Sequence, residues 1–206
     1  MEPTGKLKVI TERNFSAHHL LIGAAYSVLG TQKTEPPGRP YNELIVITLC
    51  ALSVEALCNA VGAAVIPNWK VRESLSPIEK LSLLCEHLKA EYDKGKDPWA
   101  SARWLYRVRN LIAHAKPEFV QERKVVSRDD YDRGITAFPK SRLEKEITFD
   151  NAHRALRTAE DIKDLLCSKL PPEKWFGLTL DSSSGRVSAH SNVSQRGVRS
   201  KAVPRR

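Results

Sequence analysis

The sequence predicts an all-α protein: an up-and-down bundle of four to five main helices followed by a disordered basic tail. Apolar residues recur at three- and four-residue spacing through five segments of the 206-residue chain. Segments rich in Pro and Gly separate them, and no alternating strand pattern of useful length competes. The length favours one globular domain with its own core.

The first two helices are expected on either side of the turn-rich segment 31–40. The first follows a cap at Thr11 or Asn14 and ends at Gly30. The second covers residues 41–67 and is apolar almost all the way round. Its 23 residues from 44 to 66 contain no Lys or Arg and are long enough to span a bilayer. Glu55 and Asn59 at its centre favour a helix buried in the bundle, and no membrane partner is expected.

Three further helices carry local start or stop signals. In the third, Ser76 is a predicted N-cap, Pro77 a first-turn residue and Glu79 a capping-box partner. The fourth is expected from residues 97–98 to the stop at 116–117. The last begins at Asp150 and ends at the Pro pair 171–172.

The rest of the chain is divided by charge and composition. Residues 118–148 form a long charged insertion, typical of functional or mobile loops, with room for a short helix at 141–147. Residues 1–172 are therefore expected to form the helical domain, and 173–206 the tail. Of the net charge of +9, residues 171–206 contribute +5, from seven Lys or Arg and two acids. The charge of this tail is equally consistent with binding to nucleic acid and with a solvated segment that has no partner.

The cysteines indicate a reducing compartment. Cys50, Cys58, Cys85 and Cys167 lie singly among apolar neighbours, without a CxxC pair or a His cluster. They are predicted to be buried thiols, so neither a disulfide framework, a metal site nor a cofactor is expected. The N-terminus lacks the pattern of a secretory signal, which makes the cytoplasm the expected location.

One short motif occurs twice: RNFSAH at residues 13–18 and RNLIAH at residues 109–114. The first copy is predicted to form the start of a helix, with His18 and His19 on the surface or half-buried. The second follows more than two helical turns and precedes a helix stop. There His114 suits either a helix C-cap or a general base.

The second copy has a helical geometry that suggests a dimer. On an ideal helix Asn110 and His114 belong to one polar stripe, together with Arg103 and Arg107. Arg109 lies about 140° from His114 on that helix. A two-fold pairing of chains would bring these groups together more naturally than one helix can.

The segment LYRVRNLIAHAKPE, residues 105–118, resembles the RX4-6H signature of the HEPN superfamily, in which a polar residue, often Asn, follows the Arg. SVEALCNAVG, residues 53–62, is similar to the Glu-plus-Asn helix of many members, and SPIEKLSLL, residues 76–84, fits their connecting helix. The resemblance covers about residues 14–170. Residues 118–148 and the basic tail depart from it.

This resemblance implies a metal-independent endoribonuclease, usually a dimer with a composite active site. Neutral His114 would take the proton from an RNA 2'-hydroxyl, and Arg109 would stabilise charge on the attacked phosphate. Asn110 would orient the imidazole or contact the phosphate. Glu55 would hold Arg109, or form with Asn59 a buried polar bridge between helices.

Two rival functions follow from the same sequence. One is a non-catalytic HEPN-like dimerisation or adaptor module that binds a protein or nucleotide partner. The other is a simple nucleic-acid-binding protein driven by the basic tail. Many members of the superfamily act in toxin–antitoxin systems or phage defence, which would add an antitoxin or another regulatory protein as a partner.

Overall fold

The computed structural model describes residues 7–31, 41–134, 138–179 and 182–189. The chain divides into a helical unit, Phe15–Asp181, and a second unit made of Met1–Asn14 and Ser182–Arg206. Eight α-helices and two strands occur in the described residues, so the predicted all-α fold is confirmed.

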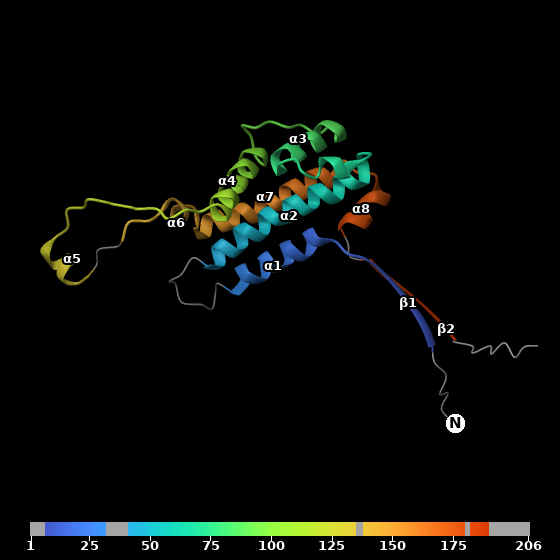
Figure 1. The fold of residues 1–206 in the computed structure, drawn as a ribbon, viewed down its shortest axis with the longest axis horizontal. Helices are drawn as coiled ribbons and strands as arrows, with labels where there is room; N and C mark the ends of the chain where they lie inside the picture. The colour runs from blue at the N-terminus through green and yellow to red at the C-terminus, as the bar shows by residue number, and fades with distance from the viewer. Residues whose placement is uncertain (1–6, 32–40, 135–137, 180–181, 190–206) are drawn as a thin grey trace, which may run out of the picture. The chain divides into compact units, whose positions relative to one another are not determined.

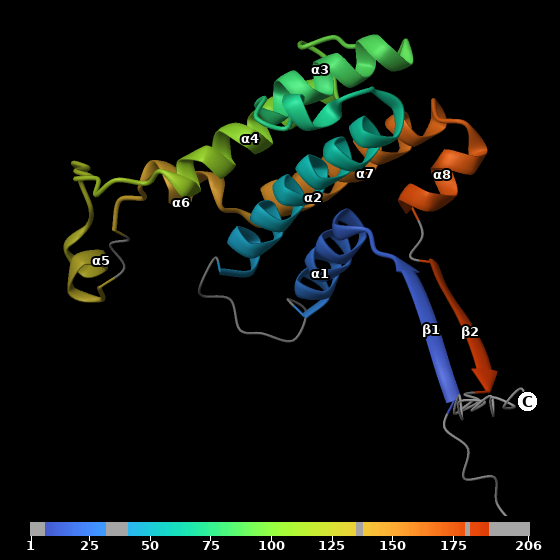
Figure 2. The same cartoon turned by 45° about the vertical axis from the view of Figure 1, so that its right-hand side comes forward.

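The helical unit is built on four long helices. These are α1 (Ala17–Thr31), α2 (Tyr41–Val65), α4 (Trp99–Ala113) and α7 (Phe149–Ser168). Figures 1 and 2 show that successive members of this set run in opposite directions. The predicted up-and-down arrangement follows from this alternation.

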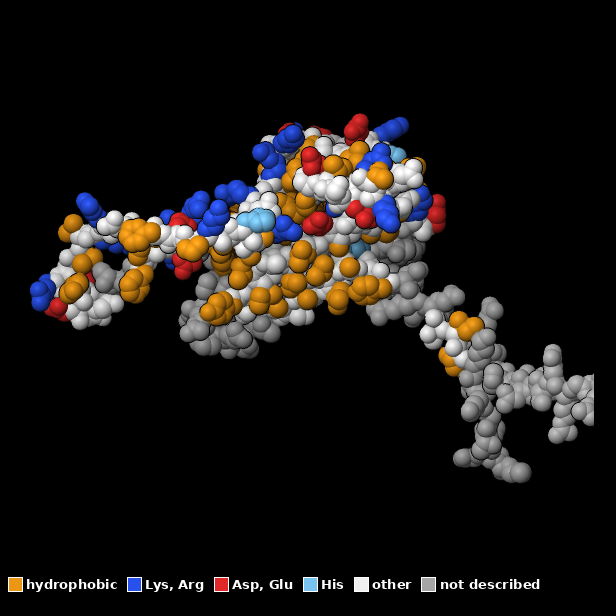
Figure 3. All heavy atoms as spheres, viewed as in Figure 1, with side chains coloured by type: hydrophobic (Ala, Val, Ile, Leu, Met, Phe, Trp, Pro, Cys, Tyr) orange, Lys and Arg blue, Asp and Glu red, His pale blue; other side chains and the backbone are white. Residues whose placement is uncertain are grey.

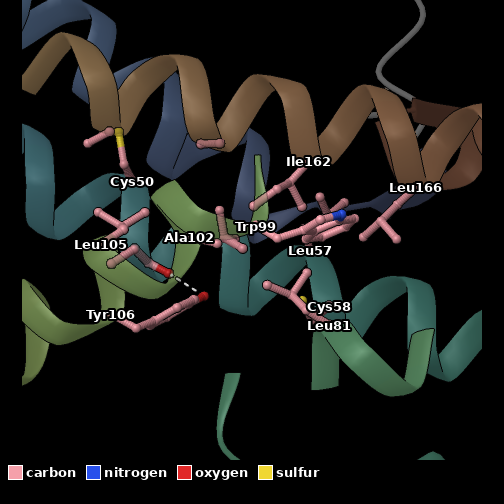
Figure 4. Close-up of a cluster of buried hydrophobic side chains, with 14 of the residues drawn as sticks. Cys50, Leu57, Cys58, Leu81, Trp99, Ala102, Leu105, Tyr106, Ile162 and Leu166 are labelled. Carbon is pink, nitrogen blue, oxygen red and sulfur yellow. Dashed lines mark hydrogen bonds between the residues drawn. The ribbon is translucent and has the colours of Figure 1, made fainter. Parts of the chain in front are cut away.

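Helix α2 is the centre of the bundle, in contact with α1, α4 and α7 and with α3 (Pro77–Leu88). Its length and composition would suffice to cross a membrane, yet half of its most apolar window is buried against its neighbours. The buried half of this helix packs in the centre of the bundle, as expected. Figure 4 shows side chains from four helices meeting in the core, among them Leu57 of α2, Leu81 of α3, Leu105 of α4 and Ile162 of α7.

Helix starts with local signals were predicted well. Ser76 and Glu79 form the expected capping box at α3, and Ser141 and Glu144 form a second one at α6 (Arg142–Glu146) inside the insertion. Thr148 caps α7, which begins at Phe149, one residue before its predicted start at Asp150. The insertion also contains α5 (Arg128–Asp132), which the sequence pattern did not indicate.

The ends of the predicted helical domain require correction. Neither Thr11 nor Asn14 caps a helix, because both lie in strand β1 (Leu7–Asn14) and α1 starts only at Ala17. Helix α4 ends at Ala113, before the expected stop at residues 116–117. The Pro pair 171–172 ends α7 as expected, but it also begins α8 (Pro172–Thr179), since Pro is well suited to the first turn of a helix.

Part of the predicted disordered tail is a strand. β2 (Ser182–Ala189) pairs antiparallel with β1, in a register that runs from Leu7 opposite Ala189 to Asn14 opposite Ser182. Its Ser- and Gly-rich sequence has low strand propensity, so the pairing with a distant partner decides its conformation. Residues 190–206, the remainder of the predicted tail, lie outside the described residues.

Candidate functional site

The predicted site lies at the C-terminal end of α4. Arg109 Nη1 donates a hydrogen bond to Asn110 Oδ1 at 3.1 Å. His114 is the C-cap of the helix, and its backbone N–H donates to the carbonyl oxygen of Asn110 at 3.0 Å. The side chains of Asn110 and His114 are exposed, and that of Arg109 is half-buried. The side chain of Asn110 therefore contacts Arg109, whereas its contact with His114 is only the backbone hydrogen bond of the last helical turn.

The predicted polar stripe on α4 is present. Arg103, Arg107, Asn110 and His114 are all exposed. Glu146 of α6 anchors this surface, because its carboxylate binds Arg107 Nη2 at 3.0 Å and accepts a hydrogen bond from Trp104 Nε1 at 2.9 Å. The short helix at the end of the insertion thus fixes the middle of the stripe.

Arg109 lies on the side of α4 that meets α2. The hydroxyl of the buried Tyr106, one turn earlier, donates to the carbonyl oxygen of Ala51 in α2 at 3.2 Å (Figure 4). Burial raises the pKa of Tyr106 well above its usual value, nearby Cys58 and Glu55 raise it further, and Arg109 opposes them. The guanidinium group of Arg109 is therefore close enough to act electrostatically on the contact between α4 and α2.

Of the two expectations for Glu55, the structure shows a polar bridge between helices and, in the part of the chain that it describes, no contact that holds Arg109. Its Oε1 lies 3.4 Å from Nζ of Lys80 in α3, a lysine that is only 1 % exposed. No salt bridge joins Glu55 to Arg109 among the described residues. Because a buried ammonium group needs a counter-charge, Lys80 takes the carboxylate that the prediction assigned to the site. The other supporting residue, Asn59, keeps a buried Oδ1 without a hydrogen-bond partner among the described residues.

The first copy of the motif is divided between the two units of the chain. Arg13 and Asn14 lie in β1, whereas His18 lies in the first turn of α1. His18 is only 2 % exposed, which corrects the expected surface or half-buried position, although His19 is half-buried as expected. His18 Nδ1 lies 2.6 Å from Ser16 Oγ, and the carbonyl oxygen of His18 accepts a hydrogen bond from the hydroxyl of Ser53. The last residue of this copy therefore helps to join α1 to α2.

A polar cavity of about 420 Å³ lies at the opposite end of α4, where α4 meets α7. Ser101 Oγ donates to Asp97 Oδ1 at 2.6 Å and accepts from Arg154 Nε at 3.0 Å. The guanidinium carbon of Arg154 lies 4.5 Å above the centre of the Trp104 ring. This network was not predicted from the sequence. Its only sign in the sequence is the four-residue spacing of Asp97 and Ser101. None of the described residues that line the cavity is a His or a Cys.

The predicted buried thiols are confirmed. All four cysteines are free and buried, and burial raises the pKa of Cys50 to about 12 and those of Cys85 and Cys167 to about 11. Within the part of the chain that the structure describes, no group of three or more His, Cys, Asp or Glu could hold a metal ion.

The candidate site is thus a half-buried Arg109 with an exposed Asn110 and His114 at a helix end, near Tyr106 and Glu146. Comparisons of the chain with models of protein families, with curated proteins and with solved structures found no match.

Proposed function

We propose that this chain is a metal-independent endoribonuclease of HEPN type that works as a cytoplasmic homodimer. The observation that carries the proposal is the hydrogen bond from Arg109 to Asn110, one turn before the exposed His114 at the C-terminal end of α4. Helix α4 contains three Arg and no Asp or Glu. An approaching RNA phosphate therefore meets cations, but no carboxylate, on this helix.

The chemistry requires a base and a cation at one phosphate. Neutral His114 accepts the proton of the 2'-hydroxyl, whose oxygen attacks the adjacent phosphorus. The bond from phosphorus to the 5'-oxygen breaks, and this oxygen takes a proton from water. The resulting hydroxide accepts the proton that His114 holds, which returns the imidazole to its neutral form. The products are a 2',3'-cyclic phosphate and a 5'-hydroxyl. The planar guanidinium of Arg109 stabilises the charge that gathers on the phosphoryl oxygens.

A homodimer would bring the Arg109 and His114 side chains together, although they point in different directions on one helix. On an ideal helix Arg109 and His114 point about 140° apart, so a single chain directs them at one phosphate poorly. A two-fold axis places equivalent helices side by side, and Arg109 of one copy then faces His114 of the other. The proposed active site is therefore composite.

The first test is cleavage of a labelled single-stranded RNA in the presence of a metal chelator. We expect wild type to cut and Arg109→Ala and His114→Ala to lower the rate by about 100-fold or more, the usual loss for a charge-stabilising group or a general base. His87→Ala is the matched control, because His87 also lies exposed in the last turn of a helix. Equal cutting by wild type and both site variants would exclude the assignment.

The composite site is tested by mixing the two inactive variants. If Arg109 of one copy works with His114 of the other, each mixed dimer regains one complete site. Random exchange of subunits then restores about one quarter of wild-type activity. A site contained in one chain would regain nothing on mixing, which would contradict the dimeric arrangement.

The second candidate function is a non-catalytic HEPN-like dimerisation or adaptor module. The exposed apolar side chains of α1 and α2 favour it, because they suit a protein partner. Such a protein would pair without cutting RNA, and His114→Ala would alter its oligomeric state or stability. In either case we propose a role in a toxin–antitoxin system or phage defence, with a regulatory protein as a further partner.

A further inference from the structure

The cavity between α4 and α7 is lined mainly by charged and polar side chains. Its volume of about 420 Å³ is in the range of small-molecule sites in proteins. Pro98 is the one apolar residue among the described residues that line it. The exposed apolar side chains of the bundle gather elsewhere, over α1 and α2, whereas Lys and Arg side chains gather over α4 (Figure 3). The cavity therefore suits a charged ligand.

The lining contains charges of both signs. Among the described residues it has two cations and three anions, which are Arg154, Arg157, Asp97, Asp150 and Asp161. All but Asp97 belong to α7, and Asp97 directly precedes α4. The cavity thus brings together charged groups from two helices that are about 50 residues apart in the chain.

Arg154 is held in a fixed position at the wall of the cavity. Its Nε donates to Ser101 Oγ at 3.0 Å, and its guanidinium carbon lies 4.5 Å above the centre of the Trp104 ring. Ser101 is only 4 % exposed and donates in turn to Asp97. The terminal nitrogens of Arg154 make no hydrogen bond or salt bridge among the described residues. A planar donor group fixed in this way is suited to a carboxylate or a phosphate.

The lining charges do not neutralise one another by direct contact. Asp150 and Arg154 are four residues apart on α7, and so are Arg157 and Asp161. Opposite charges at this spacing commonly form ion pairs on a helix. Neither pair forms a salt bridge within the part of the chain that the structure describes. The charged groups are therefore available to a ligand.

Both guanidinium groups act on the same region of the cavity. The hydrogen bond from Ser101 is the main cause that lowers the pKa of Asp97, and the positive charges of Arg154 and Arg157 lower it further. Both cations are therefore close to the Asp97 carboxylate, although neither contacts it. A ligand beside Asp97 lies in the field of both guanidinium groups.

The balance of charges selects the class of ligand. The two cations and three anions of the lining leave one negative charge in excess. A phosphate would increase this excess, and a diamine would leave both guanidinium groups without a partner. A basic amino acid carries one carboxylate and two cationic groups, so it neutralises the lining. It also offers each sign of charge a partner for charge-assisted hydrogen bonds.

We propose that this cavity binds a free basic amino acid. Its carboxylate binds Arg154 and Arg157, and its two cationic groups bind the Asp carboxylates of the lining. The cavity lies at the opposite end of α4 from His114, so this proposal goes beyond the proposed function and does not depend on it.

The test is isothermal titration calorimetry of the full-length chain with L-lysine and L-arginine. Cadaverine, which lacks the carboxylate, and ε-aminocaproate, which lacks the α-ammonium group, are the matched analogues of L-lysine. We expect L-lysine to bind about tenfold or more tightly than either analogue, because each analogue loses a charge-assisted hydrogen bond. Failure of both amino acids to bind would overturn the proposal. Tighter binding of inorganic phosphate or of either analogue would overturn the class of ligand.

Two variants locate the site. Arg157→Gln and Asp161→Asn should each weaken the binding of L-lysine by about tenfold or more, since each removes one charged partner. Both side chains are exposed, so the fold should tolerate the changes, and circular dichroism checks this. Asp164→Asn is the matched control, because Asp164 is exposed on α7 but is not among the described lining residues. Unaltered binding in the first two variants, or an equal loss in the control, would overturn the site.

Discussion

At the scale of single residues, Gly62 shows how closely the core is packed. A Cβ atom at this position in α2 would lie 2.3 Å from ring carbons of Trp69, so only hydrogen fits there. Trp69 is buried, and its ring covers the backbone of α2 where that helix approaches its end. Because Gly62 has no side chain, the indole ring of Trp69 can pack directly on the backbone of α2.

We expect Gly62→Ala to lower the free energy of unfolding by about 1–3 kcal/mol, because the added methyl overpacks the contact with Trp69. Urea denaturation with circular dichroism measures the change. Gly23→Ala in α1 is the control: a Cβ there meets nothing within 4 Å. Since Gly inside a helix costs up to about 1 kcal/mol relative to Ala, Gly23→Ala should stabilise the protein. Equal stability of the two variants would show that Trp69 does not cover Gly62.

Residue-level prediction succeeded where the cause was local. The capping box of Ser76 and Glu79 lies within four residues, so the sequence alone specifies it. The partner of Glu55 could not be predicted in this way, because Lys80 arrives on another helix. The burial of His18 likewise depends on Ser53 of α2, which follows it by 35 residues.

At the scale of elements, the N-terminal end of α4 is held by a carboxylate. Asp97 Oδ1 accepts hydrogen bonds from the hydroxyl of Ser101 at 2.6 Å and from its backbone N–H at 3.1 Å. The hydroxyl hydrogen bond is the main cause that lowers the pKa of Asp97 below its ordinary value of 3.8. A carboxyl whose pKa is lowered by folding stabilises the protein above the unfolded pKa, and this contribution disappears as the pH falls through the folded pKa.

Asp97→Asn should therefore destabilise the protein near neutral pH, and the difference from wild type should shrink as the pH falls below about 4. Urea denaturation at a series of pH values measures this slope. Asp161→Asn is the comparison, because Asp161 lines the same cavity from α7. A constant difference between Asp97→Asn and wild type at all pH values would mean that the carboxylate charge is not responsible.

Helices proved more predictable than strands for a physical reason. The long helices carry their own periodicity and end signals, so α3, α4 and α7 began within about two residues of expectation. Each of β1 and β2 forms only by pairing with the other, and the paired residues Leu7 and Ala189 lie near opposite ends of the chain. Helix α8 was missed because a Pro pair ends one helix and starts the next equally well.

At the scale of the whole molecule, the insertion between α4 and α7 is an exposed arm. Glu118 and Arg142 join its two ends by a salt bridge of 3.4 Å. Between them, Phe119, Val125 and Phe138 are almost fully exposed, while oppositely charged residues in α5 and at its end pair with one another. The arm therefore adds little to the stability of the bundle.

Replacing residues 120–139 with a short Gly–Ser linker should leave the free energy of unfolding within about 0.5 kcal/mol of wild type, since exposed positions contribute little. Chemical denaturation measures this value, and sedimentation should detect the same dimer. A large loss of stability would show that the arm packs on the bundle. Loss of the dimer alone would place the dimer interface on the arm.

The paired strands determine how the chain responds to mechanical force. Leu7 and Ala189 form the outer end of an eight-residue ladder, and Asn14 and Ser182 lead directly into the two ends of the helical unit. A pull on Leu7 and Ala189 acts along the hydrogen bonds, which lie perpendicular to antiparallel strands, and breaks them one pair at a time. The ladder therefore separates before the pulling force acts on α1 or α8, so the two strands unfold before the bundle does.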